Sequence, residues 1–272
     1  MEGEMNTLER FFSLEGKAVL LTGAGGGIGH ALGRALAGAG ASVALHARSM
    51  GKLEDLALEI RRAGMRAVSL TAELGDIHAA RELVERARAG LGRLDVLVNC
   101  AAMNRRKPIS QVTEDDWDTI MAVDLKSLYF MSQAAHGIMR TQGSGKIIHI
   151  GSINSNFALG SVSVYGAAKG AVAQLTKVMA VEWAKDNIQV NCVIPGFINT
   201  PLAKPIWDDP YKAQWLRQRI PVRRPAEPEE LVGAVLLLAG PGSSYITGTS
   251  ISVDGGVLAG GWWEPDEVVA KY

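Results

Sequence analysis

The sequence predicts an α/β protein built on one doubly wound parallel sheet of seven strands, with helices on both faces. Short β-branched or aliphatic segments alternate with longer segments of helical periodicity, which is typical of repeated βαβ units. Several of the short segments are apolar throughout, as expected for strands that helices cover on both faces. Near the start of the chain, a strand-like segment leads through a glycine-rich turn into a helix, the order that a phosphate-binding βαβ unit requires.

The elements follow from this alternation. The expected strands, in chain order, are residues 18–21, 42–46, 67–70, 96–99, 146–150, 189–193 and 250–253. The expected helices are residues 28–39, 50–63, 77–90, 114–140, 163–185 and 228–239. The first helix is indicated by the apolar residues Ala31, Leu32, Ala35 and Leu36 on one face, and the last by the favourable first turn that begins at Pro228.

We expect one domain over residues 1–272, with its core in residues 15–257, because proline and glycine are spread over element ends instead of gathering in a linker. Residues 199–226 interrupt the alternation and are rich in Pro, Trp and Arg, which favours a substrate lid or else a packed surface excursion. The aromatic C-terminal tail, residues 258–272, is expected to contact either a neighbouring subunit or its own domain.

Composition excludes several function classes. The 28 basic and 28 acidic residues cancel, so no field exists to attract nucleic acid or an anionic membrane. No stretch approaches the roughly 20 apolar residues that span a bilayer. The histidines show no ligand spacing, so no metal is expected, and the two cysteines are expected to be free thiols. The chain begins without an export signal, and a cytoplasmic protein is the expectation.

The glycine-rich turn is the first candidate site, because glycines let the backbone turn sharply and approach a pyrophosphate at a helix N-terminus. An ordinary tight turn is the alternative interpretation of such a cluster. The candidate residues of the turn are Gly23, Gly25, Gly26, Gly27, Ile28 and Gly29.

A second candidate site combines a phenol, an ammonium group and a hydroxyl. Tyr165 and Lys169 are four residues apart and therefore share one face of a helix, where the lysine cation favours the phenolate form and assists proton transfer. Ser152 follows a strand-like segment, and ligands of open α/β sheets bind beyond the carboxyl ends of strands. A turn-forming or helix-capping serine is the alternative, and Ser155 offers the same chemistry nearby.

Together these motifs resemble the short-chain dehydrogenase/reductase family over residues 15–257. The resemblance implies a Rossmann-type subunit that binds NAD(H) or NADP(H), with hydride passing between the nicotinamide and a carbonyl or alcohol carbon. The matching segments are Thr22-Gly23-x-x-x-Gly27-x-Gly29, Asp95-Val-Leu-Val-Asn99, Ser152, Tyr165-x-x-x-Lys169, Pro195-Gly196 and Val253-Asp-Gly-Gly256.

The resemblance also implies roles for individual residues. Ser152 would bind the substrate carbonyl oxygen, Tyr165 would exchange a proton with it, and Lys169 would assist Tyr165 and bind the nicotinamide ribose. Asn154 and Arg105 are further candidates for substrate contact. The remaining cofactor contacts implied by position are Asn99, Ala101, Pro195, Gly196, Ile198 and Thr200, with Glu73 and Leu74 beside the adenine.

Asp124 is the main departure from the family pattern, which usually has asparagine at this position in a proton relay to the lysine. A carboxylate there is expected to stabilise the Lys169 cation while opposing the phenolate, and so to lower the rate or shift its pH dependence. The alternative is that the backbone alone performs the role of this residue.

The end of the second strand bears on the choice of cofactor. NAD-preferring relatives usually carry an acidic residue where this chain has Ala47, and Arg48 with Ser49 suits a 2′-phosphate. NADP(H) is therefore the preferred cofactor, with NAD(H) possible because Gly26 stands where many NADP-preferring relatives have a cation. A solvated Arg48 and a helix-capping Ser49 are the alternative.

The substrate half resembles the branch of the family that contains gluconate 5-dehydrogenases and related sugar-acid oxidoreductases. Arg105, with the two cations that follow it, could meet a substrate carboxylate, although charge runs usually face water. A 3-oxoacyl carrier-protein reductase is the alternative enzyme, and a cofactor-binding sensor without turnover is the alternative outside catalysis. The expected partners are a small carbonyl or alcohol substrate and, by family resemblance, three further copies in a homotetramer.

Overall fold

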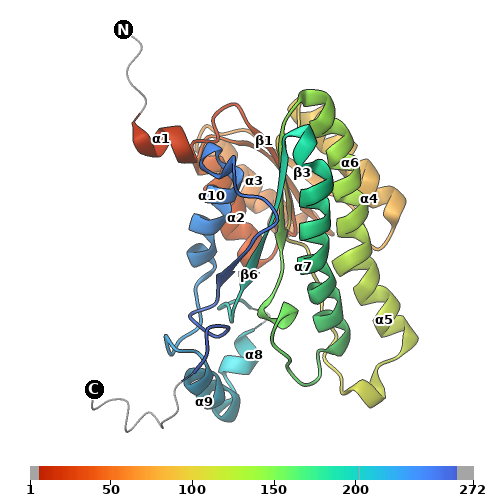
Figure 1. Cartoon of the computed structure of the whole chain (residues 1–272), viewed down its shortest axis with the longest axis vertical. Helices are drawn as coiled ribbons and strands as arrows, with labels where there is room; N and C mark the ends of the chain where they lie inside the picture. Colours follow the sequence, from red (N-terminus) through yellow and green to blue (C-terminus); the bar gives the residue numbers. More distant parts are fainter. Residues whose placement is uncertain (1–5, 202, 262–272) are drawn as a thin grey trace.

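Seven parallel strands form the centre of the computed structural model, which describes residues 6–201 and 203–261 (Figure 1). The sheet order is β3-β2-β1-β4-β5-β6-β7, so the chain reverses direction across the sheet between β1 and β4. This reversal is the switch point at which open α/β sheets bind ligands. The strands are β1 (Ala18–Thr22), β2 (Ser42–Ala47), β3 (Ala67–Thr71), β4 (Val96–Asn99), β5 (Gly145–Ile150), β6 (Ile188–Pro195) and β7 (Ser250–Val253). The predicted doubly wound, seven-stranded sheet is confirmed.

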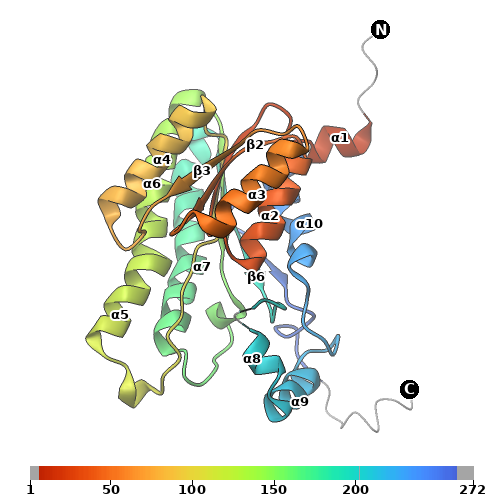
Figure 2. The same ribbon diagram turned by 180° about the vertical axis from the view of Figure 1, so that it is seen from behind.

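Helices cover both faces of the sheet (Figures 1 and 2). Helices α2, α3 and α10 pack against one face, and α4, α6 and α7 pack against the other, each through its own cluster of buried aliphatic side chains. The helices are α1 (Thr7–Phe12), α2 (Gly27–Gly38), α3 (Gly51–Arg62), α4 (Ile77–Leu91), α5 (Glu114–Met121), α6 (Ser127–Gln142), α7 (Ser163–Trp183), α8 (Lys204–Trp207), α9 (Pro210–Arg219) and α10 (Val232–Ala239).

Alternate residues of each strand serve the two clusters. In β1, Val19 and Leu21 belong to the α2 side, whereas Ala18 and Leu20 belong to the α4 side. All five residues of β1 are buried, which explains why the central strands are apolar without alternation.

The expected helix over 114–140 is instead two helices joined by a π-helical turn at Ala122–Lys126. Ser127 and Ser132 in this stretch donate their hydroxyls to carbonyls four residues earlier. A π turn inserts one extra residue, so it rotates the side chains that follow it, and such turns often occur at functional sites. The turn contains Asp124, whose side chain is buried.

Residues 199–226 include two short helices, α8 and α9, which lie beyond the carboxyl ends of the strands (Figure 1). A third apolar cluster fixes them, because Leu216 of α9 and Ile220, which follows this helix, pack with Ile153 and Val257. Of the C-terminal tail, residues 262–272 lie outside the described residues, so the expected contacts of the tail stay predictions. Helix α1, which the sequence did not suggest, begins with a capping box between Asn6 and Glu9.

Candidate active site

The glycine turn after β1 brings three backbone segments into close approach. Gly23 has a positive φ of 75°, and a Cβ there would lie 2.8 Å from the Cα of Ala101. A Cβ on Gly29 would lie 2.1 Å from the carbonyl oxygen of Gly23, so helix α2 begins directly against the turn. Both positions therefore require glycine for steric reasons.

The N-terminus of α2 faces the open side of this turn. Its N-cap residue, Gly26, has no side chain to bond the first N–H groups, which leaves them for a ligand. A Cβ on Gly27 would lie 3.1 Å from the Cγ2 of Thr200, so the structure brings Thr200, predicted from the other half of the chain, to this turn.

Thr22 is a residue of this site whose role the sequence did not reveal. Its hydroxyl oxygen accepts hydrogen bonds from the backbone N–H groups of Cys100 and Ala101, at 3.0 and 3.1 Å. The ends of β1 and β4 are thereby joined at the switch point. Thr22 is a positioning residue for the glycine turn and for the segment around Asn99 and Ala101.

The end of β2 lies beside the same turn. A Cβ on Gly25 would lie 3.3 Å from the Cβ of Ala47, and Arg48 and Ser49 follow as exposed residues. Neither side chain has a hydrogen bond or ion pair to another residue of the described part of the chain, so both are available to a ligand. At the end of β3, Leu74 is buried, and the exposed Glu73 carboxylate accepts the N–H of Gly75 at 3.2 Å.

Lys169 is fully enclosed at the centre of the site. Its Nζ donates to the carbonyl of Ile150 at 3.1 Å and lies 3.7 Å from an oxygen of Asp124 and 5.5 Å from the ring centroid of Tyr165. Burial lowers the pKa of Lys169, but the negative charges that Asp124, and on ionisation Tyr165 and two cysteines, place near it outweigh this effect, and its pKa is raised. Lys169 therefore stays an ammonium ion beside the phenol.

Asp124 faces Lys169 from the π-helical turn. One carboxylate oxygen accepts the N–H of Met103 at 2.8 Å, whereas the other has no hydrogen-bond partner among the described residues. Burial raises the pKa of Asp124, and the Lys169 cation opposes this rise only in part. The Asp124 carboxylate thus lies close to Lys169, as the sequence predicted. The contacts with Lys169 and Met103 are made by the side chain of Asp124.

Ser152 lies just beyond β5 in an extended conformation and is 8% exposed. Its oxygen accepts the N–H of Asn154 at 3.1 Å, and its hydroxyl donates to the amide oxygen of Asn154 at 3.3 Å. The competitor Ser155 points elsewhere, because its hydroxyl donates to the carbonyl of Lys169 at 2.8 Å. That bond docks the segment carrying Ser152 and Asn154 onto the helix that carries Tyr165 and Lys169.

A hydrogen-bond network supports Asn99 from behind. The amide nitrogen of Asn99 donates to Ser132 at 3.1 Å, and His149 contacts Ser132 at 3.2 Å and Thr176 at 3.0 Å. His149 is fully buried, and this burial lowers its pKa to about 3, so the ring is neutral. The amide oxygen of Asn99 has no partner among the described residues. The sequence indicated Asn99 but not Ser132, His149 or Thr176.

The segment after β6 continues along the same edge of the sheet. A Cβ on Gly196 would lie 2.6 Å from the Cα of Asp254, so only glycine lets Pro195 and Gly196 pass this close to the end of β7. Ile198 is buried and pairs with Ala226 in a short bridge that ties the two ends of the excursion together.

Arg105, which was predicted to contact a substrate carboxylate, contacts carboxylates of the protein itself. Its guanidinium is 2.5 Å from Asp115 and 3.2 Å from Asp116, and Lys107 lies 2.5 Å from Asp116. Asp116 has a pKa far below its usual range because of hydrogen bonds from Lys107 and Thr113. These contacts tie Arg105 to the first turn of α5. The predicted contact with a substrate carboxylate stays untested, and the pairing with two carboxylates argues against it.

Three polar or aromatic residues near the site were not identified from the sequence. Asn104, in the loop after β4, has a buried amide oxygen without a partner among the described residues. Arg219, at the end of α9, has a buried Nε that also lacks a hydrogen-bond partner among the described residues. Its Cζ lies 4.7 Å from the centroid of the Phe157 ring. No local pattern could have found them, because their setting depends on contacts between distant segments.

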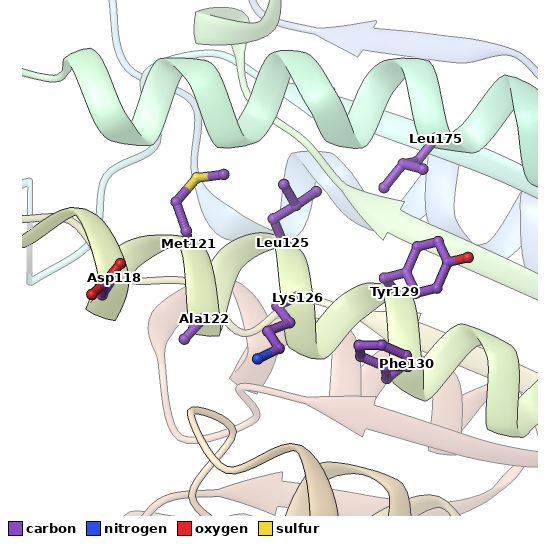
Figure 3. Close-up of a pocket in the computed structure, with 8 residues that line it drawn as sticks. All are labelled: Asp118, Met121, Ala122, Leu125, Lys126, Tyr129, Phe130 and Leu175. Atoms are coloured by element: carbon purple, nitrogen blue, oxygen red, sulfur yellow. The ribbon is translucent and has the colours of Figure 1, made fainter.

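A surface hollow of about 550 Å³ lies on the face of α5, α6 and α7 (Figure 3). Met121, Leu125 and Leu175 point into the space between the helices, and Tyr129 closes one end. None of the candidate catalytic residues lines it. The hollow is therefore separate from the candidate active site.

The site fits a dinucleotide. A glycine turn that leaves helix N–H groups uncapped suits a pyrophosphate, and the end of β2 offers a free guanidinium and hydroxyl to the adenosine ribose. A lysine ammonium has three N–H donors, and the carbonyl of Ile150 takes one of those of Lys169. Within residues 6–201 and 203–261, no group of histidine, cysteine and carboxylate side chains could hold a metal ion, and no helix is long and apolar enough to cross a membrane.

This fold is that of a Rossmann-type protein, and the residues at the carboxyl edge of its sheet fit NAD(P)(H). Sequence comparison agrees: the profile of the family described as Enoyl-(Acyl carrier protein) reductase matches residues 23–258. The chain belongs to the short-chain dehydrogenase/reductase family and is an NAD(P)-dependent oxidoreductase, as the sequence predicted.

Relatives within the family include enzymes of sugar acids. The chain is 35% identical to gluconate 5-dehydrogenase of Gluconobacter oxydans over 90% of its own length and 96% of that of the relative. It resembles the crystal structure of a gluconate 5-dehydrogenase from Burkholderia cenocepacia in complex with NADP and tartrate, with a TM-score of 0.88, 36% identity and coverage of 92% and 98%. A 3-oxoacyl (acyl-carrier-protein) reductase from Agrobacterium tumefaciens with NADP bound has a TM-score of 0.89, 33% identity and coverage of 94% and 99%.

Proposed function

We propose that the protein interconverts a secondary alcohol and a ketone on a sugar acid, such as gluconate and 5-ketogluconate. Ser152, Tyr165 and Lys169 are the proposed catalytic residues, with Asp124 acting on Lys169. The observation that carries the proposal is the enclosed Lys169 ammonium beside the Tyr165 ring, on the helix to which the Ser152 segment is docked. The gluconate 5-dehydrogenases among the relatives support the choice of substrate class.

The proposed mechanism assigns one role to each side chain. The bound cofactor supplies the hydride that reaches the carbonyl carbon. The Ser152 hydroxyl turns from its long bond to Asn154 and donates to the carbonyl oxygen. The Tyr165 phenol gives its proton to that oxygen, and the Lys169 ammonium stabilises the phenolate that remains. Oxidation of the alcohol runs these transfers in reverse.

A substrate panel tests this proposal. Purified protein is mixed with NADPH and 5-keto-D-gluconate, acetoacetyl thioesters or simple ketones, and cofactor absorbance is followed. The proposal predicts the highest kcat/KM for the keto acid of the sugar. A higher kcat/KM for the acetoacetyl thioester would favour the second candidate, a 3-oxoacyl carrier-protein reductase, which the description of the family and the similar reductase structure support. Cofactor binding without turnover of any carbonyl or alcohol would favour a sensor.

We further propose that NADP(H) is the preferred cofactor. Arg48 and Ser49 are exposed at the end of β2 beside the glycine turn, where a guanidinium can pair with a 2′-phosphate. Arg48→Ala is expected to raise the KM for NADPH by about tenfold and to leave the KM for NADH unchanged. Equal effects on both cofactors would contradict the proposal. Gly26 leaves NAD(H) usable because it supplies no second cation.

We also propose that four copies assemble through the helices around the hollow of Figure 3. The outer faces of these helices expose large apolar side chains, including Trp117, Tyr129, Val178 and Val181. Large apolar side chains exposed on neighbouring helices are typical of interfaces between subunits. Light scattering is expected to give the mass of a tetramer, and a monomer at micromolar concentration would contradict the assembly.

A further inference from the structure

Two arginines near the candidate active site differ in what they contact. Arg105 is paired with the carboxylates of Asp115 and Asp116. Arg219 has no hydrogen bond or ion pair to any residue in 6–201 and 203–261, and its Nε is buried. The Arg219 side chain is half-buried, and a guanidinium nitrogen that is withdrawn from water and left without an acceptor is unusual in proteins, because buried donors are nearly always paired.

Arg219 is held in place by an aromatic ring. Its Cζ lies 4.7 Å from the ring centroid of Phe157, within the range of a cation–π interaction. A contact with the face of the ring does not occupy the N–H groups of the guanidinium. These groups therefore remain free to donate in parallel to the two oxygens of a carboxylate.

The position of Phe157 connects this arginine to Ser152. The carbonyl of Phe157 accepts a hydrogen bond from the side-chain amide of Asn154 at 3.0 Å, and the backbone N–H of Asn154 donates to the Ser152 hydroxyl oxygen at 3.1 Å. Helix α9 is bound to the same segment, because Leu216 and Ile220 pack in one apolar cluster with Ile153. Arg219 thus belongs to the unit that carries the hydroxyl proposed to bind the substrate carbonyl.

We propose that Arg219, held on the face of Phe157, binds the carboxylate of the substrate and makes the enzyme selective for carbonyl compounds that carry an acid group. This inference rests on the proposed function and deepens it, since it assigns the recognition of the acid to α9. It also replaces Arg105 in that role, because two protein carboxylates already neutralise Arg105.

The test compares each acid with its uncharged methyl ester. Steady-state kcat and KM are measured with NADPH for 5-keto-D-gluconate and its methyl ester, and for acetoacetate and methyl acetoacetate. In the Arg219→Gln variant, the KM for an acid is expected to rise by about ten- to a hundredfold, as for loss of a charge-assisted bidentate pair, while that for the ester stays unchanged. Arg219→Lys keeps the charge without the planar guanidinium, so its KM for an acid is expected to lie between those of the wild type and of Arg219→Gln.

Arg217, an exposed arginine on the same helix, provides the matched control, and Arg217→Gln is expected to change neither KM. An equal rise for acid and ester in Arg219→Gln would indicate a packing role and overturn the inference. So would an acid-specific rise in Arg105→Gln but not in Arg219→Gln. If Arg219→Gln does not fold, the ratio of the KM for the acid to the KM for the ester is measured in Arg219→Lys instead and decides the question.

The two substrate pairs separate this inference from the proposed function. Turnover of the acetoacetate pair without the sugar-acid pair would refute the proposed substrate, and the acid-to-ester ratio of the acetoacetate pair would then decide the role of Arg219. A wild-type enzyme that prefers neither acid over its ester would overturn the inference.

Discussion

The two ends of the parallel sheet differ in how their buried polar groups are hydrogen-bonded. We call the end where the strands begin the amino edge and the end where they finish the carboxyl edge. At the amino edge, Asp95 accepts the N–H of Ala18 at 2.9 Å and both arms of the Arg93 guanidinium at 2.6 Å. Gln142 bonds both the N–H and the carbonyl of Leu94, and Lys146 donates to Ser243 at 2.8 Å. These hydrogen bonds join neighbouring segments at the amino edge of the sheet.

At the carboxyl edge, several buried polar atoms lack partners. Within the described ranges, the buried side-chain atoms without a hydrogen bond belong to His46, Asn99, Asn104, Asp124 and Arg219. His46 and Asn99 lie near the carboxyl ends of β2 and β4, and the other three lie in segments beyond that edge. An unpaired buried group costs about 1–3 kcal/mol, so a concentration of them at one edge is expected where a ligand completes the bonds. We infer that the paired edge stabilises the fold and that the unpaired edge is where the proposed binding and catalysis take place.

Removing Asp95 tests the paired edge and has the largest expected effect on stability. Asp95→Ala leaves the N–H of Ala18 and the Arg93 guanidinium without their acceptor, so the free energy of unfolding is expected to fall by about 3 kcal/mol. Denaturant unfolding measures this loss. The dissociation constant for NADPH is expected to stay the same, and weaker binding in the folded variant would contradict the division between the edges.

His149 tests the network behind Asn99. The pKa of the folded His149 is lowered to about 3, below the usual value of 6.5, so the unfolded chain binds more protons between these two pH values. Its contribution to stability is therefore present above about pH 6.5 and decreases as the pH falls, by about 1.4 kcal/mol per unit.

In His149→Gln, this part of the slope of unfolding free energy against pH is expected to disappear between pH 6 and pH 4. The exposed His78 supplies the control, since His78→Gln should leave the slope unchanged. An unaltered slope in His149→Gln would show that the ring is not held neutral.

Asp124 gives the smallest expected effect. Asp124→Asn removes a buried charge 3.7 Å from the Lys169 ammonium and leaves that cation unopposed beside the phenol. The rising limb of the pH–rate profile for alcohol oxidation should then move to lower pH, by less than about one unit. A profile that superimposes on the wild-type profile would mean that the carboxylate has no influence on the phenol.

Much of the fold could be predicted from local sequence patterns. Uniformly apolar strands and amphipathic helices predicted the order of the elements. The spacing of Ser152, Tyr165 and Lys169 predicted a candidate site whose segments lie together in the structure, and its catalytic role stays a prediction. The π-helical turn at Ala122–Lys126 could not be predicted, because one inserted residue scarcely disturbs helical periodicity.

The contacts that charged side chains make could not be predicted from the sequence either. The sequence contains many carboxylates that Arg105 could meet, and only the fold selects Asp115 and Asp116. Arg219 and Phe157 are distant in the chain, and their contact depends on how α9 packs against the segment after β5. Non-local contacts of this kind leave no periodic signal in a single sequence.

The most direct measurement of the central claim is the rate of hydride transfer in Tyr165→Phe, followed in a single turnover by NADPH fluorescence. The account predicts a rate lower by about a hundred- to ten-thousandfold, with NADPH affinity and unfolding free energy unchanged, because the variant loses the proton donor. Hydride transfer at the wild-type rate would contradict the assignment of chemistry to this edge of the sheet.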